Sequence, residues 1–194
     1  MSGMRDIEMI DAPSGIANLI AARRTVHKFQ PIPLPKELII ESISVARWAP
    51  NHKLTEPWRF YLIGEETKQS IAHLVADYVR ERKGDKMAKA KLELWLKVPN
   101  MVVVTYKKSG NAFREKEDYA ATCCAIHNMS LHLWEKGVGM KWSTARVMEK
   151  RAFYDLLAID PEREETVGVL WCGFPADVPT KSRKPVGAIV RDLP

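Results

Sequence analysis

Three consecutive side chains near the N-terminus, Arg23, Arg24 and Thr25, have the chemistry to bind a phosphate. Arginine presents a planar fork of N–H donors that matches phosphate oxygens, and the threonine hydroxyl adds one more donor. A second basic stretch, 181–184, lies near the other end of the chain. A purely structural role is equally open for the first stretch, because arginines at a helix C-terminus interact favourably with the helix dipole. From the residues alone, this stretch is either an anion site or a helix end.

The stretch 46–62 has the composition of a loop that holds a flat ligand. It contains two prolines, which fix the backbone and remove two N–H donors, and its tryptophans, Trp48 and Trp58, flank Asn51 and His52. A rigid polar loop edged with aromatic rings suits a planar ligand. The commoner alternative is a helix-to-strand connection whose tryptophans pack into the core. Both interpretations stay open at this point.

The sequence carries no signature of catalysis by side chains. It has no GxSxG nucleophile elbow, no phosphate-binding P-loop and no GxGxxG motif after a strand. His127 and His132 are five residues apart, which is the wrong spacing for two metal ligands on one helical face. We therefore predict no catalytic side chain and no metal site, and this absence favours a cofactor that carries the difficult chemistry.

The elements that must position these residues follow an irregular alternation of helices and strands. Helical spacing predicts helices over 14–24, 35–48, 65–82, 86–97, 114–136 and 148–159, and apolar runs predict strands over 58–63, 99–106 and 166–174. The first helix is expected to begin at Ser14 and the second at Pro35. The pattern predicts an α+β fold in which a central mixed sheet of about four strands is flanked by helices. A length of 194 residues predicts a single domain over 1–194.

Composition narrows the possible partners. The chain has a net charge of +6, but its basic residues are dispersed among 24 acidic ones, and no nucleic-acid-binding motif accompanies them. Nucleic-acid binding is therefore a minor alternative. The three cysteines are odd in number and form no CxxC pair, and the first 15 residues contain no apolar run long enough for a signal peptide. We expect a cytoplasmic protein with no membrane span.

Four motifs, taken in order, resemble the nitroreductase family of FMN flavoproteins. They are R-R-T at 23–25, the W-A-P-N-H and E-P-W-R-F stretches at 48–60, G-V-G-x-x-W-S-T at 137–144, and the final G-F-P with K-S-R-K-P. The resemblance runs from about residue 16 to residue 190 and is greatest for the compact single-domain branch. It implies a nitroreductase-like fold and a domain-entwined homodimer with FMN at the subunit interface.

The resemblance also implies a role for each matching residue. Arg23, Arg24 and Thr25 would hold the FMN phosphate and ribityl chain, and Lys181 and Arg183 would return to the phosphate. The remaining expected FMN contacts are His27 at the pyrimidine edge, Trp48, Asn51 and His52 from the second subunit, and Trp142, Ser143 and Thr144 beside the ring.

Two positions depart from the family pattern. His27 replaces an Arg or Lys, and its charge depends on pH. Glu56 replaces a Gln and receives no role.

The implied activity is the oxidation of NADH or NADPH through FMN, with reduction of a nitroaromatic or quinone-type small-molecule acceptor in a ping-pong sequence. The alternative is an FMN store or sensor without significant turnover. The sequence leaves open the physiological acceptor, the preference between NADH and NADPH, and the number of electrons transferred. It also leaves open the role of residues 80–97, where the acceptor pocket is expected.

Overall fold

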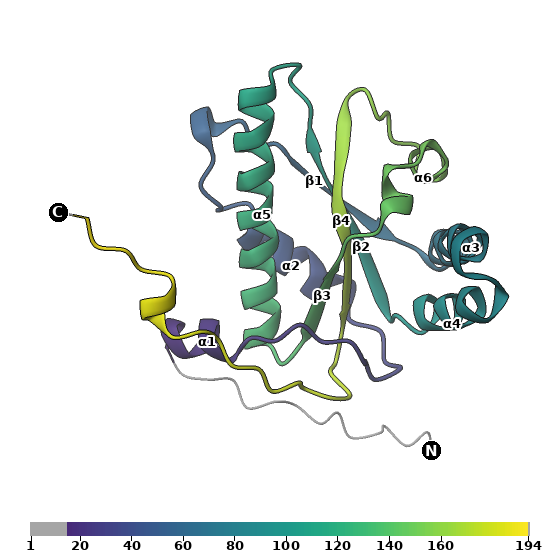
Figure 1. The fold of residues 1–194 in the computed structure, drawn as a ribbon, viewed down its shortest axis with the longest axis horizontal. Coiled ribbons are helices and arrows are strands. Elements are labelled where there is room, and N and C mark those ends of the chain that lie inside the picture. The colour runs from purple at the N-terminus through teal and green to yellow at the C-terminus, as the bar shows by residue number, and fades with distance from the viewer. Residues whose placement is uncertain (1–14, 194) are drawn as a thin grey trace.

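The computed structural model describes residues 15–193 and, within them, six α-helices and four β-strands around one sheet (Figure 1). Three short 3-10 helices, η1 (His52–Leu54), η2 (Arg146–Glu149) and η3 (Val186–Ala188), lie in the connections. The expected helix start at Ser14 lies outside the described residues. In the described part of the chain, no helix is long and apolar enough to cross a membrane.

The sheet has the strand order β1-β2-β4-β3. Its strands are β1 (Trp58–Ile63), β2 (Asn100–Lys107), β3 (Gly139–Ser143) and β4 (Glu164–Gly173), and all three neighbouring pairs are antiparallel. The α+β prediction with about four strands is confirmed, but the expectation of a mixed sheet is wrong for these strands. Two antiparallel helices connect β1 to β2. They bring the chain back to the end of the sheet at which β1 finishes, and β2 then runs antiparallel to β1.

The sheet core comes from the apolar runs that predicted its strands. Val102, Val103 and Val104 of β2 are fully buried, as are Val169 and Leu170 of β4. Continuous burial on both faces of a central strand requires β-branched and apolar residues at successive positions. The two central strands are therefore covered on both sides, and β3 forms an edge.

Helices cover the two faces of the sheet (Figure 1). Helices α2 (Lys36–Ala46) and α5 (Ala112–Glu135) contribute to the apolar cluster on one face. Helices α3 (Glu65–Lys83), α4 (Asp85–Leu96) and α6 (Arg151–Leu156) belong to the other face. Asn111 caps the N-terminus of α5, because its side-chain Oδ1 accepts hydrogen bonds from the backbone N–H groups of Phe113 and Arg114, both at 3.1 Å.

Several predicted elements need correction. The helix expected over 14–24 is observed as α1 (Ile16–Ala22), which has no buried residue; Ile16 is 74% exposed, so its apolar side chain does not enter the core of the protomer. The helix expected over 148–159 is reduced to α6, because the chain first forms η2 and later turns at Ala158, where φ is 53°. Helix α4, expected over 86–97, begins at Asp85 and contributes to the core, since its Trp95 is 3% exposed and packs edge-on against Trp171 at 5.0 Å between ring centroids.

Candidate functional site

The segment that follows α1 lies against the free edge of β3. Thr25 forms a parallel bridge to Met140, and the Val26 N–H donates to the Met140 carbonyl at 3.2 Å. Val26 is completely buried, and Gly139 allows the close approach, since a Cβ on Gly139 would lie 2.4 Å from Val26 Cγ2. The glycine of the G-V-G motif therefore lets the Arg23–Thr25 stretch dock on the sheet.

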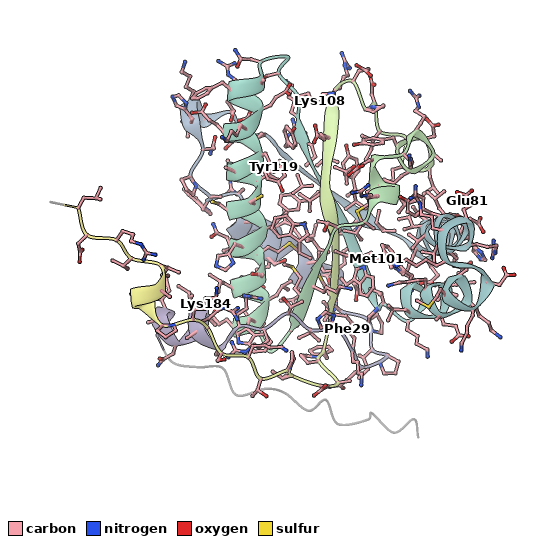
Figure 2. All side chains as sticks on the ribbon, viewed as in Figure 1. Phe29, Glu81, Met101, Lys108, Tyr119 and Lys184 are labelled. Atoms are coloured by element: carbon pink, nitrogen blue, oxygen red, sulfur yellow. The ribbon has the colours of Figure 1, made fainter. Side chains whose placement is uncertain are left out.

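The C-terminal segment returns to the same place. The Gln30 N–H donates to the Phe174 carbonyl at 2.8 Å, and the Ala176 N–H donates to the Lys28 carbonyl at 3.0 Å. This antiparallel pairing turns the C-terminal segment back along residues 23–30. In Figure 2, Phe29 marks the paired stretch, and Lys184 lies further along the segment, beside α1. The two basic stretches of the sequence consequently lie near one another.

Arg23 is a half-buried cation in this region. Its Nε is buried and has no hydrogen-bond partner among the described residues. Burial lowers the pKa of Arg23, and the positive charges of Arg183 and Arg24 lower it further. The guanidinium groups of Arg23, Arg24 and Arg183 repel one another, and the buried Nε of Arg23 lacks an acceptor among the described residues. Both features stabilise an anion bound at this place.

The sequence left two roles open for the arginines of the R-R-T motif, an anion site or a helix end, and the structure places the two side chains differently. Arg24 Nη1 donates to the carbonyl oxygens of Ala21, at 2.6 Å, and Arg23, at 2.9 Å. It therefore caps the C-terminus of α1, whereas the Nε of Arg23 has no such bond. Lys181 is exposed in the same C-terminal segment, two residues before Arg183.

The sequence reasoning missed His127, which it considered only as a metal ligand with His132 and rejected in that role. Burial lowers the pKa of His127, and the charge of Arg23 lowers it further, so the imidazole on α5 lies close to the arginine cluster. No sequence signal marked this residue, because its proximity to Arg23 depends on the packing of α1 against α5.

β3 places its successive side chains on alternating faces of the sheet. Trp142 lies on the α5 face, where its Nε1 donates to the Val167 carbonyl at 3.1 Å, and Gly168 makes room for its ring. A Cβ on Gly168 would lie 2.3 Å from that nitrogen. Lys141 lies on the opposite face, with its Nζ 3.8 Å from the ring centroid of Trp171. The position of the Trp142 ring is therefore fixed by β4.

The end of β3 borders a cavity of about 430 Å³ between the sheet and helices α3 and α4. Trp142, Ser143 and Thr144 line it, together with residues that sequence reasoning did not select. His27 is exposed and lies two residues beyond Thr25, the residue bridged to β3. Within one protomer, the residues expected to contact the FMN phosphate and those expected to contact its ring therefore lie along the same edge strand, β3.

The expected loop contacts lie elsewhere in the protomer. The Asn51 side chain is used inside the loop, since its Nδ2 donates to the Ala49 carbonyl at 3.2 Å and its Oδ1 accepts from the Glu56 N–H at 3.0 Å. His52 Nδ1 lies 3.0 Å from a Glu117 carboxylate oxygen. Thr55 Oγ1 donates to the buried carboxylate of Asp118 at 2.6 Å, which fixes the loop on α5.

The loop and the arginine cluster contact different parts of α5. Glu117 holds the loop and His127 lies near Arg23, and ten helical residues correspond to about 15 Å along the axis. The structure therefore does not bring Asn51 and His52 to Arg23 within one protomer. Trp48 also points away from the core and is 76% exposed, with the Arg47 guanidinium 5.3 Å from its ring centroid.

The loop backbone is strained. Lys53, Leu54 and Glu56 have φ values of 56°, 51° and 42°, in the left-handed region that non-glycine residues rarely occupy. Such strain persists where surrounding contacts impose it, and it is frequent at functional sites. Trp58 is buried and Phe60 packs against the core, so Trp58 has the packing role that was one of its two possible interpretations.

Comparison with known proteins gives one consistent result. Residues 20–174 match the model of a protein family described as the nitroreductase family. The chain is 30% identical over 189 residues to YfhC of Bacillus subtilis (strain 168), which is provisionally named an NAD(P)H nitroreductase, and the match covers 94% of this chain and 96% of YfhC.

Solved structures agree in fold. A nitroreductase-like family protein from Bacillus cereus superposes with a TM-score of 0.81 at 31% identity, over 95% of this chain and 98% of that one. The FMN- and NADPH-dependent nitroreductase NfnB from Sphigopyxis sp. strain HMH has a TM-score of 0.74 at 15% identity, over 92% and 98% of the two chains. This second similarity bears on the fold alone.

Proposed function

This chain belongs to the nitroreductase family, and from that membership we propose that it is an FMN-dependent NAD(P)H oxidoreductase that reduces nitroaromatic or quinone-type acceptors. The observation that carries the proposal is the half-buried Arg23, whose Nε has no partner and whose neighbours Arg24 and Arg183 are also cationic. A phosphate group would supply the missing acceptor oxygens and the missing negative charge. The nitroreductase-like relatives cover nearly the whole chain, which supports the same assignment.

The residues at the edge of β3 fit an elongated cofactor with an anionic end and a flat ring. Arg23, Thr25 and Arg183 would hold the phosphate, with Arg24 and Lys181 adding positive charge nearby. At the other end of β3 the hydroxyl side chains of Ser143 and Thr144, with the Trp142 backbone, would border the ring. The single domain over 1–194 would thus hold most of one cofactor.

FMN, when bound, would supply the redox chemistry that links oxidation of NADH or NADPH to reduction of the acceptor, in the proposed ping-pong sequence. The protein contributes binding, orientation and electrostatics. His27, which is exposed, would donate a hydrogen bond from an imidazole N–H to the polar edge of the ring. We expect no side chain to act as nucleophile or general base.

A second copy of the chain would complete the site. Apolar residues of α1, η1 and the C-terminal segment are exposed, including Ile16 at 74%, Leu54 at 81% and Ile189 at 74%. These elements project on one side of the molecule, at the left of Figure 1. Covering them in a homodimer removes apolar area from water, and the partner's loop would then bring Trp48, Asn51 and His52 to the flavin.

The proposal is tested on the purified protein. We expect one FMN per chain and oxidation of NADH or NADPH that depends on added nitrofurazone or menadione. Protein that does not bind FMN, and that leaves both nucleotides unoxidised, refutes the proposal. Stoichiometric FMN that NADH and NADPH fail to reduce supports the alternative role as a flavin store or sensor.

A further inference from the structure

The cavity at the end of β3 has walls that suit a flat aromatic ligand. Its volume of about 430 Å³ lies within the range of small-molecule sites. Tyr78, Trp95 and Trp171 contribute aromatic side chains, and Val75 and Val147 contribute aliphatic ones. Trp95 and Trp171 are almost completely buried and contact each other edge-on, so this wall is rigid.

The charged side chains around the cavity all have the same sign. Arg82, Lys83, Lys91 and Lys141 line it, and no aspartate or glutamate is among its described lining residues. The Arg82 guanidinium lies 4.3 Å from the ring centroid of Tyr78, in a cation–π contact. Burial lowers the pKa of Lys141, and the charge of Lys91 lowers it further, so two ammonium groups act on the same space.

Three acidic side chains of α3 and α4, those of Glu65, Asp77 and Asp85, are paired with bases outside the cavity. Arg80 contacts Asp77 and Asp85, and Lys68 Nζ lies 2.7 Å from a Glu65 carboxylate oxygen. None of these five residues lines the cavity. No described acidic residue of either helix lines the cavity, so its cations are available to a ligand.

These cations are separate from the arginine cluster assigned to the FMN phosphate. Arg23 acts on Arg183 and His127 and does not line the cavity, whereas Lys141 projects from β3 onto the face covered by α3 and α4. One anion, the cofactor phosphate, cannot satisfy both groups. The cavity can therefore accept a second anion.

We propose that this cavity selects acceptors that carry a carboxylate on a flat aromatic ring, with Lys91, Lys141 and Arg82 binding the carboxylate and the tryptophan wall contacting the ring. The proposal rests on the assigned function, since it names the acceptor class of that same site. Two positive charges at a partly desolvated position attract a carboxylate more strongly than solvent-exposed lysines do. Neutral nitroaromatic compounds gain only the ring contact.

The test compares two acceptors of similar size, 4-nitrobenzoate and 4-nitrobenzyl alcohol, on the FMN-loaded protein. We expect kcat/KM for 4-nitrobenzoate to exceed kcat/KM for 4-nitrobenzyl alcohol by about tenfold or more, which is the scale of one charge-assisted hydrogen bond. Lys91→Gln and Arg82→Gln should each raise KM for 4-nitrobenzoate several-fold and leave the alcohol nearly unchanged. Lys89→Gln is the matched control, because Lys89 lies on the same helix but borders a different surface hollow.

A second measurement does not require turnover. Benzoate should quench the tryptophan emission of the protein with a dissociation constant several-fold weaker in Lys91→Gln, whereas benzyl alcohol should bind equally to both proteins. Trp95 and Trp171 in the cavity wall provide the signal.

Three results would overturn the proposal. They are equal kcat/KM for the two acceptors, variants that raise KM for NADH or NADPH instead, and benzoate binding that Lys91→Gln leaves unchanged. Failure of FMN loading or of all turnover refutes the proposed function instead, and the benzoate titration then still decides whether the cavity prefers an aromatic anion.

Discussion

Replacing Arg23 with methionine should have opposite effects on cofactor affinity and on the stability of the cofactor-free protein. Methionine keeps most of the aliphatic length of arginine but removes the charge and the N–H donors. In the cofactor-free protein, the Arg23 Nε is buried without a partner, and the guanidinium is close to the charges of Arg24 and Arg183. Removing it therefore removes an unfavourable group.

The magnitudes follow from these contacts. A hydrogen bond to a charged group contributes about 1.5–3 kcal/mol, so Arg23→Met should weaken FMN binding by roughly 10- to 150-fold. An unsatisfied buried donor costs about 1–3 kcal/mol. Because Arg23 is only half-buried, we expect the cofactor-free variant to be as stable as the parent or more stable by up to about 1 kcal/mol.

The assay combines two measurements on the same samples. Fluorescence titration with FMN gives the dissociation constant, and urea denaturation of cofactor-free protein gives the free energy of unfolding. Lys28→Met is the control, because Lys28 is an exposed cation in the same segment, and its FMN affinity should change less than threefold. If Arg23→Met keeps its FMN affinity, or loses more than about 1 kcal/mol of stability without FMN, the assignment of Arg23 to the phosphate is wrong.

Further predictions concern His127, Gly139 and the loop that carries His52. The pKa of His127, held below 6.5 by burial and by Arg23, should rise when FMN binds, as NMR titration would measure; an unchanged pKa would separate this residue from the phosphate. In the FMN-free protein, the folded state binds the His127 proton less tightly than the unfolded chain does. The free energy of unfolding should therefore fall as the pH drops below about 6.5. Gly139→Ala should cost about 1–3 kcal/mol in denaturation experiments, because its Cβ would overlap the docked segment, and parental stability would contradict that docking. His52→Ala should lower FMN retention or turnover with little loss of stability, whereas Trp58→Ala should mainly destabilise by about 3–5 kcal/mol; the reverse pattern would return the loop to a purely structural role.

The sequence was sufficient for the elements whose burial depends on their own residues. β2 and β4 were predictable from β-branched and apolar runs, and α2 from the helical spacing of apolar residues such as Ile39 and Ala46, which are both buried. β3 was not predicted as a strand, because it is a five-residue edge strand that contains Lys141 and Ser143. Short edge strands carry little pattern, and their pairing is decided by the neighbouring strand.

The candidate site was only partly visible in the sequence. The motifs indicated Arg23 and Trp142, but Lys91 and Arg82 lie on helices whose facing depends on how α3 and α4 pack on the sheet. Lys141 was not recognised either, because the alternation that places it on the face opposite Trp142 can be used only once residues 139–143 are known to form a strand. The apolar stripe of α1 was visible too, but its exposure in the protomer could not be read from one chain.

The central claim is that the protein holds FMN and passes reducing equivalents from a nicotinamide nucleotide to a small acceptor. The most direct measurement is an anaerobic titration of the FMN-loaded protein, followed by absorption spectroscopy. We predict that NADH or NADPH bleaches the flavin absorption at one equivalent per site, and that 4-nitrobenzoate or menadione then restores it without nucleotide present. A flavin spectrum that neither nucleotide changes, or that the acceptors fail to restore after bleaching, would contradict the proposed activity.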